Sequence, residues 1–536
     1  MINNEGRKYM PRLVLALLTS VVAIAAGAQE NVRPRMVVGI MIDGLDSQYL
    51  DMLRNHFGQD GFNRLLRESA IIANADYGTN VDATAATAML MTGAAPSTNS
   101  VTAAEVYNPE TRLPVAAMFD AEAIGNYTQQ TFSPKNLAVS TLADEVRIAG
   151  AGESQVFAIA PNASQAVLLA GHSANCAIWL DQSSGYWASS TYYKTFPSML
   201  TKRSRHNPLP VRIDTLMWTP LKGSEHYPGL PDRVRRAGFS YVFDGDGLNE
   251  YSKFRNSPLL NSEVTDIAGD IIAEYMLGAD EVTDMINVAY SLKPYRYSSS
   301  NENRYELMDS YLRLDQDIAT LIRKVENQTG QGNALFFVAA TPPSGRSRRD
   351  DEKWGIPYGE FSTRKAQSLL NVYMIAKFGN GQWVNAYHNG QFYLNHKLIN
   401  SLNLDARTVR TEAALFLARM SGVDHAYTSD DIINGRGDSH LEALKRNTYA
   451  PTAGDIYVEV DPGWEIVDDI VSSVNEKRVR IVNRLAPATA PVYILAPNVE
   501  AGIIDTPVDV RVVAPTVARL LRIRSPNGAF MPALVF

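Results

Sequence analysis

Two stretches of the 536-residue chain carry side chains whose type and position would allow them to take part in chemistry. The apolar run of residues 36–42 predicts a buried strand, and Asp43 follows it directly. Further on, a threonine-rich loop reaches Thr84 and opens a predicted helix at residues 85–91. A carboxylate at a strand end can bind a metal ion, and a hydroxyl can serve as a nucleophile. The elements that carry these two groups must bring them together for either chemistry.

Other common catalytic patterns are missing from the sequence. None of the eight histidines stands in the His-x-x-x-His, Asp-x-x-x-His or Asp-His-Gly spacing of a metal site. The chain has no Gly-x-Ser-x-Gly motif, P-loop or strand-following Gly-x-Gly-x-x-Gly. Cys176 is the only cysteine, which excludes an intrachain disulfide. With His172 it could form a thiol–imidazole pair, but a buried core residue is the preferred interpretation.

The alternation of apolar runs and helical patterns predicts an α/β fold. We expect a doubly wound, mainly parallel sheet with helices on both faces and the site at the carboxyl ends of the strands. Predicted strands are residues 36–42, 155–160, 286–291, 334–340 and 491–496. Predicted helices are residues 60–69, 85–91, 136–149, 263–277, 304–326 and 408–420. Within one domain of residues 29–536, segments 183–249 and 377–450 are expected to be inserted caps, with a hairpin at His388-Asn389-Gly390.

The first 28 residues predict a cleavable signal peptide. Arg7, Lys8 and Arg12 precede the apolar run 13–26, and a small-x-small pattern ends at Ala28. Synthesis could start at Met1 or at Met10. We therefore expect export to the periplasm or outer cell envelope of a Gram-negative bacterium. The mature chain shows no further stretch of membrane-spanning length, and the net charge of −7 argues against nucleic acid as a partner.

Several motifs resemble the alkaline phosphatase superfamily, in particular its branch of periplasmic phosphate-irrepressible alkaline phosphatases and nucleotide pyrophosphatase/phosphodiesterases. The strand-end Asp43 and the helix ending in Thr92-Gly93-Ala94-Ala95-Pro96 match the start of that family's pattern. Further similar segments include Ser133-Pro134-Lys135-Asn136-Leu137, Ala170-Gly171-His172, Gly454-Asp455-Ile456 and Ala514-Pro515-Thr516. The resemblance covers nearly the whole mature chain and implies the superfamily's α/β fold.

The resemblance also implies a two-metal site, and here the sequence departs from the family. Asp43 keeps the place of a zinc ligand, whereas the nucleophile position falls on Ala83, with Thr84 one residue later. A Lys-x-Arg pair that holds phosphate is replaced by Asn162-Ala163-Ser164, and Asn301 stands in place of a metal-binding aspartate. The other ligand positions hold no histidine.

These substitutions lead us to expect a catalytically degenerate member of the superfamily. It would act as a binding or scaffolding component of the cell envelope, with an envelope protein as a partner and no cofactor. One alternative is an active phosphomonoesterase or phosphodiesterase, dependent on zinc or another divalent metal, with a rearranged site around Asp43 and Thr84. A second alternative is a metal-free protein that binds a small phosphorylated or sugar ligand through Asn162, Ser164 and Asn301.

Overall fold

An eleven-stranded sheet forms the centre of the protein. The structure, a computed structural model, describes residues 33–79, 81–243, 250–298, 303–341, 355, 359–468, 479–482 and 488–536. The segment expected to be a signal peptide lies outside these residues, and the chain from Pro34 to Phe536 groups as one unit. Among the described residues, no helix has the length and apolar character needed to cross a membrane.

The strands of the central sheet follow the order β21-β2-β20-β12-β1-β11-β6-β7-β8-β5, and β22 pairs with β2. Five neighbouring strands, β12, β1, β11, β6 and β7, are parallel, which confirms the mainly parallel α/β prediction. The strand predicted at 491–496 runs antiparallel to both neighbours. The strand bounds are β1 Met36–Asp43, β2 Ala70–Asp76, β5 Gly125–Asn126, β6 Val156–Ala160, β7 Cys176–Leu180, β8 Trp187–Ser190, β11 Asp284–Ser291, β12 Ala334–Thr341, β20 Thr489–Leu495, β21 Gly502–Ile504 and β22 Val508–Asp509.

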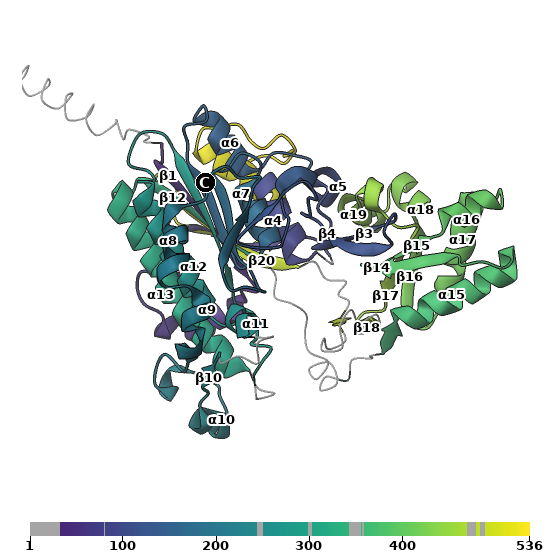
Figure 1. Cartoon of the computed structure of the whole chain (residues 1–536), viewed down its shortest axis with the longest axis horizontal. Coiled ribbons are helices and arrows are strands. Elements are labelled where there is room, and N and C mark those ends of the chain that lie inside the picture. Colours follow the sequence, from purple (N-terminus) through teal and green to yellow (C-terminus); the bar gives the residue numbers. More distant parts are fainter. Residues whose placement is uncertain are drawn as a thin grey trace, which may run out of the picture. The chain divides into compact units, whose positions relative to one another are not determined.

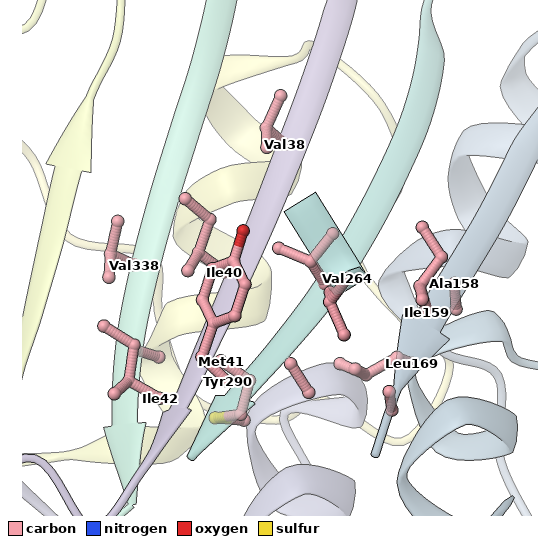
Figure 2. Packing of buried hydrophobic residues seen from close by; sticks show 14 of the residues in the cluster. Val38, Ile40, Met41, Ile42, Ala158, Ile159, Leu169, Val264, Tyr290 and Val338 are labelled. Atoms are coloured by element: carbon pink, nitrogen blue, oxygen red, sulfur yellow. The ribbon is translucent and has the colours of Figure 1, made fainter. Parts of the chain in front are cut away.

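Helices cover both faces of this sheet (Figure 1). On one face lie α12 (Leu259–Glu274) and α13 (Arg304–Thr329), with α2 (Ser47–Leu53) and α3 (Phe62–Glu68) beside α13. On the other lie α4 (Ala83–Thr92), α6 (Leu142–Ala149), α7 (Ala163–Ala170) and α20 (Val513–Leu520). The parallel strands are buried on both sides, so they are apolar along most of their length rather than alternating. Figure 2 shows this packing, with Val38, Ile40 and Val338 from neighbouring strands.

The predicted helix at 136–149 is too long. Residues Pro134–Asn136 form a separate 3-10 turn, and α6 begins only at Leu142. Thr141 caps α6 by accepting a hydrogen bond from the backbone N–H of Asp144, whose carboxylate accepts from the Thr141 N–H in return. This capping box fixes the first turn of the helix.

A second, four-stranded sheet takes three strands from the segment 377–450 that was predicted to be a cap, and its fourth strand lies beyond that segment. Its order is β14 (Val384–His388), β15 (Gln391–Leu394), β17 (Ile456–Val460) and β16 (Val423–Thr428). It has its own hydrophobic cluster with α15 (Thr363–Phe378) and α17 (Ala406–Leu417). The predicted hairpin is confirmed: Asn389 and Gly390 have φ angles of 47° and 77°, as a two-residue type I′ turn requires.

The expected insert at 183–249 contains short elements rather than long ones. They are α8 (Ser198–His206), α9 (Leu209–Arg212), β9 (Met217–Trp218), α10 (Asp232–Ala237) and β10 (Tyr241–Val242). Buried Trp218 anchors the segment to α13, because its indole N–H donates to the Asp309 carboxylate at 2.7 Å. The division of the domain into a core and caps remains a prediction.

Candidate active site

The register of the parallel strands brings three polar residues to one edge of the sheet. Asp43 ends β1 and lies directly between Ser291 at the end of β11 and Thr341 at the end of β12. The backbone N–H of Leu292 continues the ladder by donating to the Asp43 carbonyl at 2.8 Å. In open α/β sheets, the carboxyl ends of the strands form the usual site of ligand binding. Asp43 therefore occupies the expected position for chemistry.

The carboxylate of Asp43 is held by two neighbours. The Thr341 hydroxyl donates to one of its oxygens at 2.6 Å, and the Lys293 ammonium forms an ion pair with the other. Lys293 lies two residues after Ser291, the end of β11, and Ser291 is the ladder partner of Asp43; the strand register therefore positions this cation near Asp43. The Asp43 side chain is 14% exposed and that of Lys293 45% exposed, which leaves the ammonium accessible to a ligand.

The start of helix α4 supplies the second half of the site. Asp82 caps the helix by accepting hydrogen bonds from the N–H groups of Thr84 and Ala85, both at 2.9 Å. Its other carboxylate oxygen accepts from the Ala104 N–H at 2.6 Å. Ala83 and Thr84 are thus the first two residues of α4. Of the two positions considered for the nucleophile, only Thr84 carries a hydroxyl.

Burial raises the pKa of the Asp82 carboxyl, and the negative charge of Asp43 raises it further. The hydrogen bonds from three backbone N–H groups act in the opposite direction but are outweighed. Because the charge of Asp43 affects the pKa of Asp82, the end of β1 lies within electrostatic range of the start of α4. The contact of Asp82 with Thr84 runs through the Thr84 backbone N–H, which fixes the residue at the start of the helix.

The remaining predicted binding residues lie elsewhere or outside the described part of the chain. Asn162 caps α7, accepting a hydrogen bond from the Gln165 N–H at 3.0 Å, and Ser164 is partly buried in the first turn of that helix. Asn301 lies outside the described residues. The structure thus gives Asn162 a local structural role, while the joint binding role proposed for the three residues is untested.

Sequence reasoning missed Lys293, Thr341 and Asp82. Thr341 directly follows one predicted strand and Lys293 lies two residues past another, so their positions could have indicated them. Neither is a metal ligand of the family pattern, and for that reason they were not selected. Asp82 precedes a helical pattern, as a capping residue should. His172, by contrast, is structural: its ring nitrogens contact the Asp144 carboxylate at 2.9 Å and the Leu137 carbonyl at 3.0 Å. Cys176 is buried in β7, as expected of a core residue.

The described donors do not by themselves form a two-metal site. Within the ranges that the structure describes, no group of three or more His, Cys, Asp or Glu side chains could hold a metal ion. Asp43 is the only carboxylate at the β1 edge among the contacts described above, and it is already paired with a lysine. Zinc in proteins takes three or four such ligands. The two-zinc donor set implied by the resemblance therefore does not fit these residues.

The chain matches the model of the type I phosphodiesterase / nucleotide pyrophosphatase family over residues 37–481. It belongs to this family. Alkaline phosphatase PafA of Elizabethkingia meningoseptica is 25% identical over 539 residues, covering 95% of this chain and 96% of that protein. Alkaline phosphatase PhoV of Synechococcus elongatus is 26% identical over 524 residues, covering 94% and 92%. A "calcium-transporting ATPase" of Myroides odoratus is 27% identical over 524 residues, covering 92% and 93%.

A solved structure has the same fold. The crystal structure of wild-type PafA matches with a TM-score of 0.81 at 24% identity, covering 94% of this chain and 98% of that one. Together these findings confirm the resemblance drawn from the motifs and the alkaline-phosphatase-like fold. Two of the relatives that match along nearly the whole length are named alkaline phosphatases.

The expectation of a catalytically degenerate scaffolding protein is therefore wrong, and the alternative of an active phosphoesterase fits better. That expectation rested on counting family positions along loops, and the named alkaline phosphatases that match the chain over nearly its whole length overturn it. Lys293 brings a positive charge to Asp43 from β11, and Thr84 lies in the first turn of α4 despite the shift by one residue.

Proposed function

We propose that the protein hydrolyses phosphoric esters at the edge formed by Asp43, Lys293 and the start of α4. The observation that carries this proposal is the ion pair between the strand-end Asp43 and Lys293, in a member of the phosphodiesterase family. Thr84 is the second residue of α4, whose N-cap Asp82 is affected by the charge of Asp43. The names of the relatives favour phosphate monoesters as substrates, and the family description favours diesters.

In the proposed reaction, the Thr84 hydroxyl oxygen forms a bond to phosphorus while the bond from phosphorus to the leaving alkoxide breaks. The Thr84 proton passes to Asp82, whose raised pKa suits it to accept the proton and return it to the leaving oxygen. Water then attacks the phosphothreonine and gives a proton to Asp82 while the bond from phosphorus to the Thr84 oxygen breaks. Asp82 returns that proton to the Thr84 oxygen, which releases phosphate and restores the hydroxyl.

Charge at the edge supports the same proposal. Cations placed where negative charge develops on a phosphoryl group stabilise its transition state. At the end of β1 the Lys293 ammonium, which pairs with Asp43, could serve this purpose. The α4 dipole contributes a further partial positive charge at its first turn, beside Thr84. The carboxylates of Asp43 and Asp82 oppose this; Lys293 offsets the charge of Asp43, and the backbone N–H groups of Thr84, Ala85 and Ala104 stabilise that of Asp82.

Export is the second part of the proposal. The basic residues Arg7, Lys8 and Arg12, the apolar run and the cleavage pattern ending at Ala28 support secretion to the periplasm by a cleavable signal peptide. Mass spectrometry of the protein from its native envelope fraction should then give a chain that begins at Gln29. A chain retaining residues 1–28 would contradict the export proposal without affecting the catalytic one.

The catalytic proposal is tested with p-nitrophenyl phosphate and bis(p-nitrophenyl) phosphate, each with and without added Zn²⁺, Mg²⁺ and Ca²⁺. Thr84→Ala should lower kcat by at least about 10²-fold, because it removes the attacking oxygen. Thr411→Ala is the control: that threonine lies on α17, where its hydroxyl donates to the Arg407 carbonyl. Equal rates for wild type, Thr84→Ala and Thr411→Ala under every condition would refute the proposal.

A further inference from the structure

A cavity of about 520 Å³ lies beside the candidate active site. Its wall on one side includes Val81 and Asp82, which lead into α4, together with Thr102 and with Glu105, the first residue of β3 (Glu105–Asn108). The other side comes from the four-stranded sheet and from residues that precede β17. Its size falls in the range of small-molecule sites. We refer to it as the cap pocket.

Polar contacts join the two walls of the cap pocket. The Glu105 carbonyl accepts a hydrogen bond from the Asn389 side chain at 3.0 Å and lies 3.1 Å from the His388 ring. The Asn447 amide donates to the Thr79 carbonyl at 3.3 Å. These contacts use backbone carbonyls, so the carboxylates of Asp82 and Glu105 remain part of the lining. The hairpin turn at Asn389 is thereby fixed against the start of β3.

The charge of the lining restricts the ligand. Among the described residues that line the cap pocket, there is no lysine or arginine, whereas two are acidic, Asp82 and Glu105. An anionic group would meet like charge from Asp82 and Glu105, and the one imidazole of the lining, His388, already contacts the Glu105 carbonyl, so burying an anion there would be costly. The Asp82 carboxylate already accepts three backbone N–H groups, so a ligand would donate chiefly to Glu105 and must supply donors such as hydroxyl groups. The group that fits this pocket is uncharged and rich in O–H.

The aromatic and amide residues of the lining favour a ligand that contains a ring. Tyr387, Tyr393, Tyr449 and Tyr457 line the cavity, and tyrosine presents a flat apolar face together with a polar edge. Asn389, Gln391 and Asn447 add amide groups, which can both donate and accept. Tyrosine faces with amides and carboxylates between them suit a polyhydroxylated ring, whose C–H faces pack on the aromatic rings while its hydroxyls meet the polar groups.

We propose that the cap pocket binds the neutral glycosyl group of a sugar phosphate, with the phosphate directed to the adjacent edge at Thr84. This inference rests on the proposed function, because it assigns a leaving group to the same site. It makes Tyr449, Glu105 and their neighbours determinants of substrate choice rather than catalytic residues. Phosphate monoesters of small alcohols should be poorer substrates than hexose phosphates of equal charge.

The first test measures binding of uncharged sugars and so does not depend on hydrolysis. Methyl glycosides of glucose, galactose, mannose and N-acetylglucosamine are titrated into the full-length mature protein by saturation-transfer NMR. At least one should bind, and Tyr449→Ala should weaken it about tenfold, whereas Tyr449→Phe should retain most of the affinity because the ring remains. Tyr127→Ala, which removes a tyrosine 40% exposed outside the pocket, is the matched control and should change nothing.

The second test uses turnover. For the preferred hexose phosphate, Tyr449→Ala and Glu105→Gln should raise KM about tenfold with kcat nearly unchanged, and neither should alter KM for methyl phosphate. No binding of any sugar in the panel, or equal binding by wild type and Tyr449→Ala, overturns the pocket assignment. Tighter binding of adenosine or uridine than of every sugar also overturns it. Sugar binding without hydrolysis of any phosphate would instead refute the proposed function and leave the pocket intact.

Discussion

Replacement of Lys293 by methionine tests the most specific feature of the proposed site. The change keeps an unbranched side chain of similar length and removes only the ammonium that pairs with Asp43. Asp43 keeps its hydrogen bond from the Thr341 hydroxyl at 2.6 Å, so its carboxylate is not left without a partner. The variant should therefore fold, and its defect should be in the reaction.

The two effects differ in magnitude. Lys293 is 45% exposed, and an ion pair of this kind contributes about 0–1 kcal/mol to stability because solvent screens it. A positioned charge or donor that stabilises the transition state is worth roughly 3–4 kcal/mol, or about 10²–10³-fold in rate. Lys293→Met should thus lower kcat/KM for an aryl phosphate by about 10²–10³-fold and reduce the free energy of unfolding by less than about 1 kcal/mol.

The assay compares steady-state hydrolysis with urea unfolding of the same preparations. Lys377→Met is a matched control: Lys377 is 48% exposed and pairs with Glu412 at 3.3 Å on α15 and α17, in the smaller hydrophobic cluster. It should lose a similar small amount of stability and no activity. If Lys293→Met keeps wild-type kcat/KM while Thr84→Ala is inactive, the ammonium does not act on the substrate, and the role assigned to it is wrong.

Three further predictions follow from the same contacts. Because a divalent ion at Asp43 must displace Lys293, Lys293→Met should bind Zn²⁺ more tightly than wild type in calorimetry; unchanged affinity would place any metal elsewhere. Burial of His172 lowers its pKa, but the hydrogen bond and charge of Asp144 outweigh burial and raise the pKa above 6.5. The contact between protonated His172 and Asp144 therefore stabilises the fold below pH 6.5, and this stabilisation is lost as the pH rises through the pKa of His172 in the folded protein. The loss of stability in His172→Gln, about 1–3 kcal/mol, should be larger at pH 6 than at pH 9 in urea unfolding. Burial raises the pKa of Asp317 to about 7, so ionisation of this carboxyl destabilises the folded protein as the pH rises from about 4 through 7. Asp317→Asn should therefore raise the free energy of unfolding by up to about 4 kcal/mol at pH 8, since each pKa unit above 3.8 corresponds to about 1.4 kcal/mol, and should leave it unchanged at pH 4.

The core of the fold followed from the sequence because its signals are local. Runs such as residues 36–42 and 334–340 are apolar throughout, as strands buried on both faces must be, and the structure places them side by side as β1 and β12. The hairpin at Asn389 and Gly390 was equally local, since a type I′ turn needs residues that accept positive φ. The antiparallel direction of β20 was not predictable in this way, because strand direction depends on the connection and not on the strand's own residues.

The site was predicted less well because its groups come from distant parts of the chain. Asp43 was found because it ends a strong strand pattern, yet its partners Lys293 and Thr341 are hundreds of residues away and carry no motif. The pairing depends on the register that sets Asp43 opposite Ser291 and Thr341. A shift of one residue would turn these side chains to the opposite face of the sheet.

The register of the strands accounts for the polar and charged residues found beside Asp43. The carboxyl end of β1 is fixed by burial on both sides, and the ends of β11 and β12 are fixed against it. Ser291 and Thr341 are thereby set directly beside Asp43 in the ladder, and Lys293 follows Ser291 by two residues. Lys293 pairs with Asp43 through its ammonium, where the family pattern calls for metal ligands. The register therefore accounts for the place of Lys293 beside Asp43, and the Lys293→Met variant tests whether that cation acts on the substrate.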